Sequence, residues 1–559
     1  MQQSLHQGWE GAIAGNGGEL AMRALRPWGV NEIFTLSGGH IFPILDACHS
    51  SGIRIVDTRH EQTAAFAAEA MAKLERRPGV AVLTAGPGVT NGISAITTAH
   101  FNGSPLVVLG GRAPENKWGS GSLQELDHLP IVDSVTKYAV TAFSVADGAR
   151  LVAQAAVSAA TPHRGPVFVD LPIETAFGLG SSEDPYLGYP DLVPAETGRF
   201  GIVKGEDPDT DRLDRAVTLL SQSERPALVA GGDVWLSGAE EDLVNLVETV
   251  NAPVFMNGQG RGCVPADHPL AFCRVRGALK EADVVAVIGT PLDFRLSFGK
   301  FGEAAVIHIV DSADRISQKA SPEVTVAGDI GKSLRYIAER AAHSGDRRAR
   351  SGWIEPLRAR ENAEKGAQGP VSSTIHPVQV YREAARRLDR DAVVIGDGGD
   401  FVSFAGKLVE SYQPGCWLDP GPYGCLGTGI GYAVAARLAR PDRQVVAFIG
   451  DGAFGFTGMD VDTLVRHRLD AVLIIGNNGM WGLEKHPMRA LYGYDVAADL
   501  QPGCRYDNVV KALGGAGETV EDPEDLGPAL DRALSAGAPY LLNVLLDPEA
   551  VYPRSSSLL

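Results

Sequence analysis

The sequence has few of the residues that mark disulfide-rich, zinc-binding or membrane proteins. Its 559 residues include six cysteines, and no two form a CxxC pair, which argues against a zinc site or a disulfide framework. No run approaches 18 apolar residues, and the first residues lack the pattern of a signal sequence. No HExxH spacing and no local motif for a Ser or Cys nucleophile occurs. We therefore expect a cytoplasmic protein.

Positive charge is also scarce. The 50 basic side chains are outnumbered by 68 acidic ones, which gives a net charge of −18. This balance argues against non-specific binding to nucleic acid or to an anionic membrane, although a local basic pocket for an anionic ligand is compatible with it. The hydrophobic share of 44% is ordinary for a globular enzyme, and the length suffices for about three domains.

Short apolar runs that end in Gly-rich polar turns recur along the chain, which predicts an α/β fold with parallel strands. The pattern groups into three domains, at residues 1–177, 211–340 and 371–559, joined by a linker at 178–210 and a mixed-charge helix plus coil at 341–370. Residues 11–27 are predicted to be helical. The predicted strands are 32–36, 53–58, 80–84, 106–109 and 166–171, then 227–230, 253–256, 284–288 and 306–310, then 391–395, 445–449, 471–475 and 540–546.

The most informative stretch is residues 445–484. Strand 445–449 ends at Gly450-Asp451-Gly452, and strand 471–475 ends just before Asn477-Asn478, with a crossover helix expected at 460–468. Ligands of open parallel sheets bind beyond the carboxyl ends of the strands. Carboxylate and amide oxygens suit Mg²⁺, and glycines let backbone N–H groups approach a diphosphate. The alternative is two ordinary strand-to-helix turns, in which Gly, Asp and Asn are common.

Four further side chains are candidates for chemistry, each with a structural alternative. Glu61 lies at a strand end on the first turn of an Ala-rich helix, where a carboxylate is also stabilised by the helix dipole. Gln124 lies in the loop GSLQELDH, which could be a polar surface loop. Leu426, in GCLGTG, could be a core residue, and Glu484 could be a solvated carboxylate beside Lys485.

Together these motifs resemble the thiamin-diphosphate (ThDP) enzymes. GDG is followed after 24 residues, 453–476, by NN, which matches the fingerprint of that family, and TAGPGVTN at 84–91 is similar to the acetolactate synthase-like group. The resemblance implies three doubly wound parallel-sheet domains: pyrimidine-binding, central nucleotide-binding-like and diphosphate-binding. It also implies a homodimer or homotetramer with the active site at the subunit interface.

The resemblance assigns roles to individual residues. It implies that Mg²⁺ is bound by Asp451, Asn478 and the carbonyl of Met480, and that Glu61 hydrogen-bonds N1′ of the aminopyrimidine to promote loss of the thiazolium C2 proton. Leu426 would hold ThDP in its bent shape, and Gln124 would contact the reacting carbonyl or hydroxyl. The other residues expected at the cofactor are Gly38, Gly39, Asp400, Gly424, Gly450, Gly452, Ala453, Phe454 and Trp481.

The subgroup is indicated by residues 289–302, GTPLDFRLSFGKFG, which resemble the CoA-dependent branch. That branch often has Arg where this chain has Pro291, and its central domain can hold ADP, whereas acetolactate synthases hold FAD there. Asp311 could meet a ribose hydroxyl or cap a helix. Arg554 and the neighbouring serines could close over a CoA phosphate.

We therefore expect a 2-hydroxyacyl-CoA lyase that releases formyl-CoA and a ketone or aldehyde, with Glu484 as acid/base or as a hydroxyl-binding group. The alternatives are acetolactate synthase, which joins two 2-oxo acids, and oxalyl-CoA decarboxylase. A non-catalytic nucleotide-binding regulator is a further alternative, but it predicts a damaged site, whereas Glu61, Asp451 and Asn478 are all present.

Overall fold

A computed structural model describes residues 12–186, 189, 201–341, 350–367 and 373–552. The three predicted α/β domains are confirmed as three six-stranded sheets in which every neighbouring pair of strands is parallel. The chain forms two compact units, Met1–Val203 with Tyr423–Ala439, and Lys204–Pro422 with Arg440–Leu559. Arg554 lies outside the described residues.

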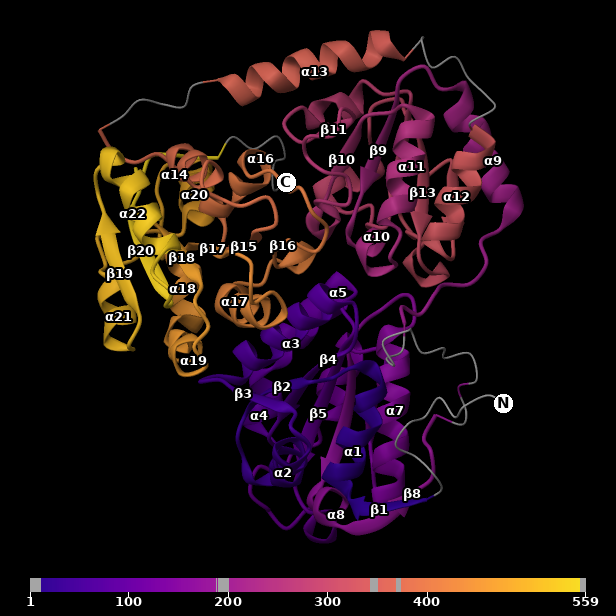
Figure 1. The fold of residues 1–559 in the computed structure, drawn as a ribbon, viewed down its shortest axis with the longest axis vertical. Coiled ribbons are helices and arrows are strands. Elements are labelled where there is room, and N and C mark those ends of the chain that lie inside the picture. The colour runs from indigo at the N-terminus through magenta and orange to yellow at the C-terminus, as the bar shows by residue number, and fades with distance from the viewer. Residues whose placement is uncertain (1–11, 187–188, 190–200, 342–349, 368–372, 553–559) are drawn as a thin grey trace. The chain divides into compact units, whose positions relative to one another are not determined.

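The first sheet has the strand order β3-β2-β4-β5-β7-β6 (Figure 1). The five strands predicted here are found, each within a few residues of its predicted bounds, and the sixth is a short strand that its mixed composition concealed. The strands are β2 (Glu32–Leu36), β3 (Arg54–Asp57), β4 (Gly79–Leu83), β5 (Leu106–Arg112), β6 (Ala139–Thr141) and β7 (Val167–Pro172). The helices around it include α2 (Phe42–Ser51), α3 (Glu61–Glu75), α5 (Ile93–Asn102) and α7 (Val145–Ala160).

The predicted helix at residues 11–27 is wrong at its start. Strand β1 (Ile13–Asn16) instead pairs antiparallel with β8 (Leu179–Ser182), and α1 (Gly17–Leu25) begins only after Asn16. The physical reason is a capping box: the Asn16 side chain accepts from Glu19 N, and the Glu19 carboxylate accepts from Asn16 N. A side chain that satisfies the first free amides of a helix fixes where the helix begins.

Helix α17 (Thr428–Ala439) packs against α3 in the first unit, although its sequence lies within the predicted third domain. The contact contains a buried polar group. Glu69 and Lys73 of α3 form an ion pair, and the hydroxyl of Tyr432 on α17 donates to Glu69 and accepts from Lys73. A buried ion pair of this kind is stable only when every partner is satisfied, so it fixes the register of the two helices.

The central sheet has the order β11-β10-β9-β12-β13-β14, which differs from that of the first sheet. The topological switch point lies between β9 and β12, because the chain leaves these adjacent strands in opposite directions along the sheet. The strands are β9 (Pro226–Ala230), β10 (Val254–Met256), β11 (Ala271–Phe272), β12 (Val284–Ile288), β13 (Ala305–Val310) and β14 (Val324–Ala327). Helices α9 (Thr210–Gln222), α11 (Glu240–Val250) and α12 (Ile330–Ala341) contribute to its core.

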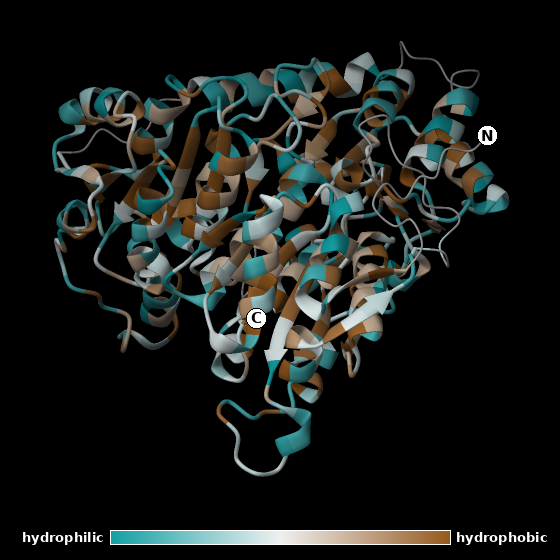
Figure 2. Cartoon of the chain, turned by 60° about the horizontal axis from the view of Figure 1, so that its bottom comes forward, coloured by the Kyte–Doolittle hydropathy of each residue, from teal (hydrophilic) through white to brown (hydrophobic). Residues whose placement is uncertain are grey.

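The third sheet has the order β16-β15-β17-β18-β20-β19. Numbered within each sheet, this order and that of the first sheet are both 2-1-3-4-6-5. The strands are β15 (Val393–Asp397), β16 (Trp417–Leu418), β17 (Val445–Gly450), β18 (Val472–Asn477), β19 (Ala516–Val520) and β20 (Tyr540–Leu545). Figure 2 shows strands of the sheets in brown because they are rich in apolar residues. None of the helices in the described part of the chain is long and apolar enough to cross a membrane.

The crossover between β17 and β18 is not the single helix predicted at residues 460–468. Helix α18 (Asp451–Thr457) starts directly at the strand end, and α19 (Val461–Arg466) follows after a short 3-10 turn. Gly455 lies within α18 and Gly458 begins the 3-10 turn, so the chain is already helical before the predicted start at residue 460. Asp451 is therefore the first residue of a helix.

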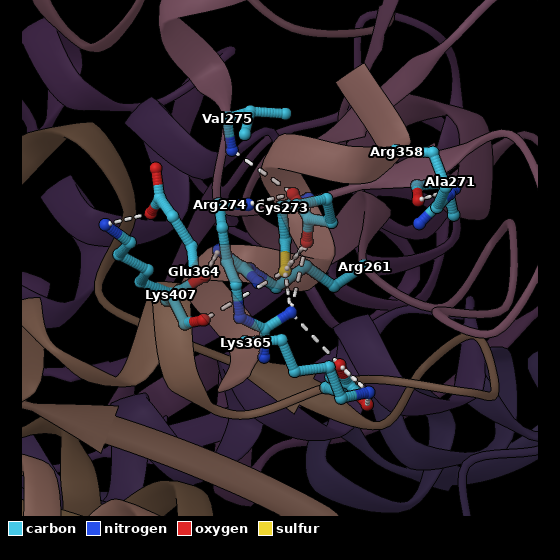
Figure 3. Close-up of polar contacts among 12 residues, drawn as sticks. Arg261, Ala271, Cys273, Arg274, Val275, Arg358, Glu364, Lys365 and Lys407 are labelled. Atoms are coloured by element: carbon cyan, nitrogen blue, oxygen red, sulfur yellow. Dashed lines mark hydrogen bonds and ion pairs between the residues drawn. The ribbon is translucent and has the colours of Figure 1, made fainter. Parts of the chain in front are cut away.

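The second linker contains α13 (Ser351–Gly366), which is anchored on one face rather than simply solvated (Figure 3). Trp353, Leu357 and Glu361 are buried at four-residue spacing. The Glu361 carboxylate accepts from the backbone amides of residues 273–275 and from the guanidinium of Arg274, whose same nitrogen also lies 3.1 Å from Glu410. Because Glu410 belongs to the third domain, Arg274 connects three consecutive segments of the second unit.

Candidate cofactor site

Asp451 is a buried carboxylate at the end of β17, with 3% of its surface exposed. Its oxygens accept from Gly452 N at 2.9 Å and from Gly479 N at 2.8 Å. Among the described residues no cationic side chain pairs with it. Burial therefore raises the pKa of Asp451 to about 6, in spite of the hydrogen bonds from backbone amides. A divalent cation at this carboxylate would supply the missing positive charge, so the residue fits a metal ligand.

The two asparagines after β18 have different surroundings. Asn477 is buried, and its amide donates to Cys504 O and to Asn543 Oδ1, each at 3.0 Å. Asn478 is only half-buried, and among the residues that the structure describes its Oδ1 accepts one hydrogen bond, from Met480 N at 3.3 Å. Asn477 thus holds the strand end together, while Asn478 keeps oxygen lone pairs for a ligand. These surroundings suit the predicted role of the second asparagine as a metal ligand, which stays a prediction.

Gly452 is required by packing rather than by room for a diphosphate. A Cβ at this position would lie 2.4 Å from the ring of Trp481, so the indole fills the space over the turn. At Gly450 a Cβ would meet only Gly398, at 3.9 Å. Close approach of a phosphate to the backbone is therefore available at Gly450.

The remaining residues predicted in this unit surround the same turn. Ala453 and Phe454 are buried in α18, and the Phe454 ring packs edge-on against Tyr506. Asp400 is buried at the start of α15 (Asp400–Ser403), close to Gly482 at the start of α20 (Gly482–Tyr492). Glu484 is exposed on the first turn of α20, and its carboxylate has no hydrogen bond or ion pair within the described part of the chain.

Glu61 is the corresponding buried carboxylate of the first unit, with 6% of its surface exposed. It is the first residue of α3, as predicted. Its Oε2 accepts from the side-chain amide of Asn91 at 3.0 Å, and Oε1 has no hydrogen-bond partner among the described residues. Oε1 faces Gly88, where a Cβ would come within 3.7 Å. One oxygen is thus fixed and the other can hold a proton.

The turns around Glu61 are closely packed. A Cβ at Gly38 would lie 2.2 Å from Thr84 Oγ1, whereas Gly39 borders open space. Burial lowers the pKa of His40, which lies 3.5 Å from the Thr84 hydroxyl. The main-chain oxygen of Leu426 accepts from the Gln62 amide at 3.5 Å, and Gly424 is exposed. Leu426 is therefore attached to the first helical turn that carries Glu61.

Gln124 has a left-handed backbone, with φ +60°, which is uncommon for a residue with a Cβ. It faces Gly86, itself at φ +59°, and a Cβ on Gly86 would lie 3.0 Å from both Gln124 Cβ and Gln124 O. Gln124 thus rests directly on the turn between β4 and α4 (Pro87–Asn91). Backbone strain of this kind is often found at functional sites.

In the central sheet the turns at the switch point are also compact. A Cβ on Gly231 would lie 2.5 Å from Gly289 O, and Asn257 Nδ2 donates to Thr290 Oγ1 at 3.2 Å. Asp311 is buried at the end of β13. These turns at the carboxyl ends of β9, β10, β12 and β13 are where a nucleotide binds in open α/β sheets.

Sequence reasoning missed several residues that hold this site. Asn91, Thr84, His128 and Asp170 were not predicted, because each acts through a partner far away in the sequence. Asn91 lies in the TAGPGVTN motif, so its position beside the glycine turn was the available signal.

Comparison with protein families identifies the class of protein. Models of thiamine pyrophosphate enzymes match three parts of the chain: the N-terminal TPP binding domain at residues 15–131, the central domain at 213–337 and the C-terminal TPP binding domain at 397–544. The chain belongs to the thiamine pyrophosphate enzymes, and the predicted family is confirmed.

Individual relatives refine this result. The chain is 51% identical over 547 residues to an acetolactate synthase large subunit of Mycobacterium tuberculosis and, equally, to a probable acetolactate synthase of Mycobacterium bovis, with 97% of each chain covered. It is 35% identical to 2-hydroxyacyl-CoA lyase 2 of Homo sapiens, over 95% of this chain and 90% of the relative. The relatives thus favour the alternative, acetolactate synthase, over the lyase that the sequence motifs had suggested.

Proposed function

We propose that this ThDP-dependent enzyme is an acetolactate synthase that joins two 2-oxo acids with loss of CO₂. The observation that carries the proposal is the 51% identity, over 97% of both chains, to proteins named acetolactate synthase. The lyase relatives are more distant, at 32–35% identity. The buried carboxylates Glu61 and Asp451 support a working catalytic site and weigh against a non-catalytic regulator.

The residues of the chain have distinct tasks in this proposal. Asp451, Asn478 and the Met480 carbonyl would hold Mg²⁺ and, through it, the diphosphate. ThDP, when bound, supplies the electron sink for carbon–carbon bond making and breaking. Glu61 holds or releases a proton at Oε1 while Asn91 fixes Oε2. Gln124 orients the carbonyl of the second 2-oxo acid, and Leu426 supports the bent cofactor.

Three further properties are part of the proposal. FAD would occupy the turns of the central sheet, because acetolactate synthases are expected to hold it there. A homodimer or homotetramer would bring the two halves of the site together. Glu484 would lie at the substrate entrance, since it is exposed one turn after Trp481.

The test is incubation of the purified protein with pyruvate, ThDP and Mg²⁺. We expect acetolactate and CO₂, and a yellow protein with a flavin absorbance. A parallel incubation with short 2-hydroxyacyl-CoA esters, scored for formyl-CoA by mass, tests the lyase alternative, which the identity of 32–35% to lyases keeps as second candidate. Formyl-CoA without acetolactate would overturn the proposal.

A further inference from the structure

A series of buried, hydrogen-bonded polar side chains adjoins the loop that carries Gln124 in the first unit. His128 is fully buried, and its Nδ1 lies 3.1 Å from both carboxylate oxygens of Asp170 on β7. Its Nε2 accepts from the backbone amide of Gly86 at 2.9 Å. Since Nε2 is used as an acceptor, the imidazole carries its proton on Nδ1 and donates it to Asp170.

Asp170 is held in turn by Arg112, at the end of β5. Arg112 Nη1 lies 3.1 Å from Asp170 Oδ2, and Arg112 Nε donates to Glu115 at 2.6 Å. Its guanidinium also stacks over the Trp118 ring, 3.9 Å from the centroid. Arg112, Asp170 and His128 therefore form a series of side chains in which each is held by hydrogen bonds to the next.

The series ends at the turn that supports the proposed catalytic groups. Gly86 cannot be replaced by a residue with a Cβ without displacing Gln124, which lies against it. Two residues later, Gly88 borders Oε1 of Glu61, and Asn91, on the same short helix, donates to Oε2. A shift of the Gly86 amide would thus move supports of both Gln124 and Glu61.

We propose that His128 is a positioning residue for catalysis, which acts through the Gly86 amide to hold Gln124 and the Glu61 turn in place. This inference rests on the proposed function, because it presupposes roles for Gln124 and Glu61. The sequence pattern fits it, since His128 ends the same loop, GSLQELDH, that carries Gln124. His128 thus fixes the end of that loop, while Gly86 contacts the loop at Gln124.

Two substitutions separate the two hydrogen bonds of His128. His128→Asn keeps an amide donor near the Nδ1 position for Asp170 but loses the acceptor for Gly86. His128→Gln places an amide oxygen near the Nε2 position and so keeps an acceptor for Gly86. We expect kcat for 2-oxo acid condensation to fall about 10–100-fold in His128→Asn, with KM little changed, and at most about threefold in His128→Gln.

A double-mutant cycle tests whether the effect passes through Gln124. In a Gln124→Ala background, we expect His128→Asn to lower kcat by a clearly smaller factor than in the wild-type background, because one of the two groups that His128 positions is already absent while the Glu61 turn remains. Tyr186→Phe is the control for loss of a buried hydrogen bond elsewhere in the first unit, since the Tyr186 hydroxyl accepts from Trp28 Nε1 at 3.0 Å. It should leave kcat unchanged.

Hydrogen exchange at the Gly86 amide gives a readout that does not depend on turnover. The amide should be protected in the wild type and in His128→Gln, and should exchange at least about tenfold faster in His128→Asn. Unchanged protection in His128→Asn, or an undiminished loss of kcat in the Gln124→Ala background, would overturn the inference. If the wild type fails to condense 2-oxo acids, the proposed function fails, while the exchange result still decides the link between His128 and Gly86.

Discussion

The first and third sheets share one strand order, yet their strand ends carry different chemistry. Glu61 and Asp451 are both buried carboxylates at the first position of a helix that follows a parallel strand. Glu61 is held by one side-chain amide, which leaves an oxygen for a proton. Asp451 is held at both oxygens by backbone amides and has no cationic partner among the described side chains. One strand order thus presents two buried carboxylates with different surroundings, which suit the proton transfer proposed for Glu61 and the metal binding proposed for Asp451.

The largest effect on turnover is expected at Glu61, because the role proposed for it is proton transfer rather than binding of the cofactor. Glu61→Gln keeps the size of the side chain and an acceptor for Asn91 but cannot release a proton. We expect kcat for acetolactate formation to fall about 10²–10⁴-fold, with ThDP affinity within a few-fold of wild type. Stopped-flow or product assays measure kcat, and calorimetry measures the affinity. Equal turnover in the variant would remove Glu61 from the mechanism.

A substitution at Asp451 should mainly lower the affinity for the cofactor, whereas the substitution at Glu61 should mainly lower turnover. In Asp451→Asn we expect the affinity for ThDP with Mg²⁺ to fall by more than roughly 100-fold, since loss of even an outer-shell partner of a metal typically costs about 10–100-fold. Chelation of the wild-type protein should release ThDP, and added Mg²⁺ should restore it. Asp460→Asn, at another buried acid in the same crossover, is the matched control. Unchanged affinity in Asp451→Asn would contradict a metal site there.

Asn477 and Asn478, at the end of β18, allow a structural role and a metal-binding role to be compared at neighbouring positions. Asn477→Ala removes two buried hydrogen bonds and should lower the free energy of unfolding by about 1–3 kcal/mol, measured by urea denaturation. Asn478→Ala should leave stability nearly unchanged and weaken binding of ThDP with Mg²⁺. The reverse assignment, with Asn478 carrying the stability, would mean that the first asparagine is the ligand.

Much of this could be predicted from sequence because the site residues lie at strand ends that local patterns mark. Glu61, Asp451 and Asn478 each follow an apolar run, so their placement depends on only a few neighbouring residues. The start of α1, by contrast, depends on the Asn16 capping box and on pairing of β1 with β8, more than 160 residues away. Strand pairing over such a distance leaves no local periodicity to detect.

The residues that hold the site residues in place could not be predicted from sequence either, because their partners also lie far away in the chain. Asn91 reaches Glu61 across 30 residues, and His128 reaches both Gly86 and Asp170 across 42. Gly452 was interpreted as room for a diphosphate, yet the Trp481 ring fills that space. A glycine in a sequence shows that a side chain is absent, but not which neighbour requires its absence. The sequence motifs favoured the lyase, whereas the relatives favour acetolactate synthase. Local motifs do not decide between these subgroups, because substrate pockets are assembled from residues dispersed along the chain.

The central sheet differs from the other two, because its buried titratable residue His308 lies within a strand and not at the end of one. His308 on β13 is fully buried, and its Nε2 lies 3.0 Å from Thr290 O, so it donates as a neutral ring. Burial lowers the pKa of His308, with a smaller contribution from nearby Arg315, while the bond to Thr290 O opposes the shift. The unfolded chain therefore binds a proton at a higher pH than the folded one.

This difference predicts a modest pH dependence of stability. As pH falls below about 6.5, the usual pKa of histidine, the unfolded state gains protons first, so stability decreases until the pH passes the lowered folded pKa. His308→Gln keeps a donor for Thr290 O but does not titrate. The difference in melting temperature between pH 7.5 and pH 5.5 should therefore be smaller in the variant by a few degrees, about the shift that 1 kcal/mol produces. His268→Gln is the control, since the His268 side chain is partly exposed and lies beside the exposed carboxylate of Glu248. An equal pH dependence in His308→Gln and wild type would show that protonation of the buried ring is not coupled to folding. The polar group inside this sheet would then make no electrostatic contribution to stability, in contrast to the roles proposed for Glu61 and Asp451 at the strand ends of the other two sheets.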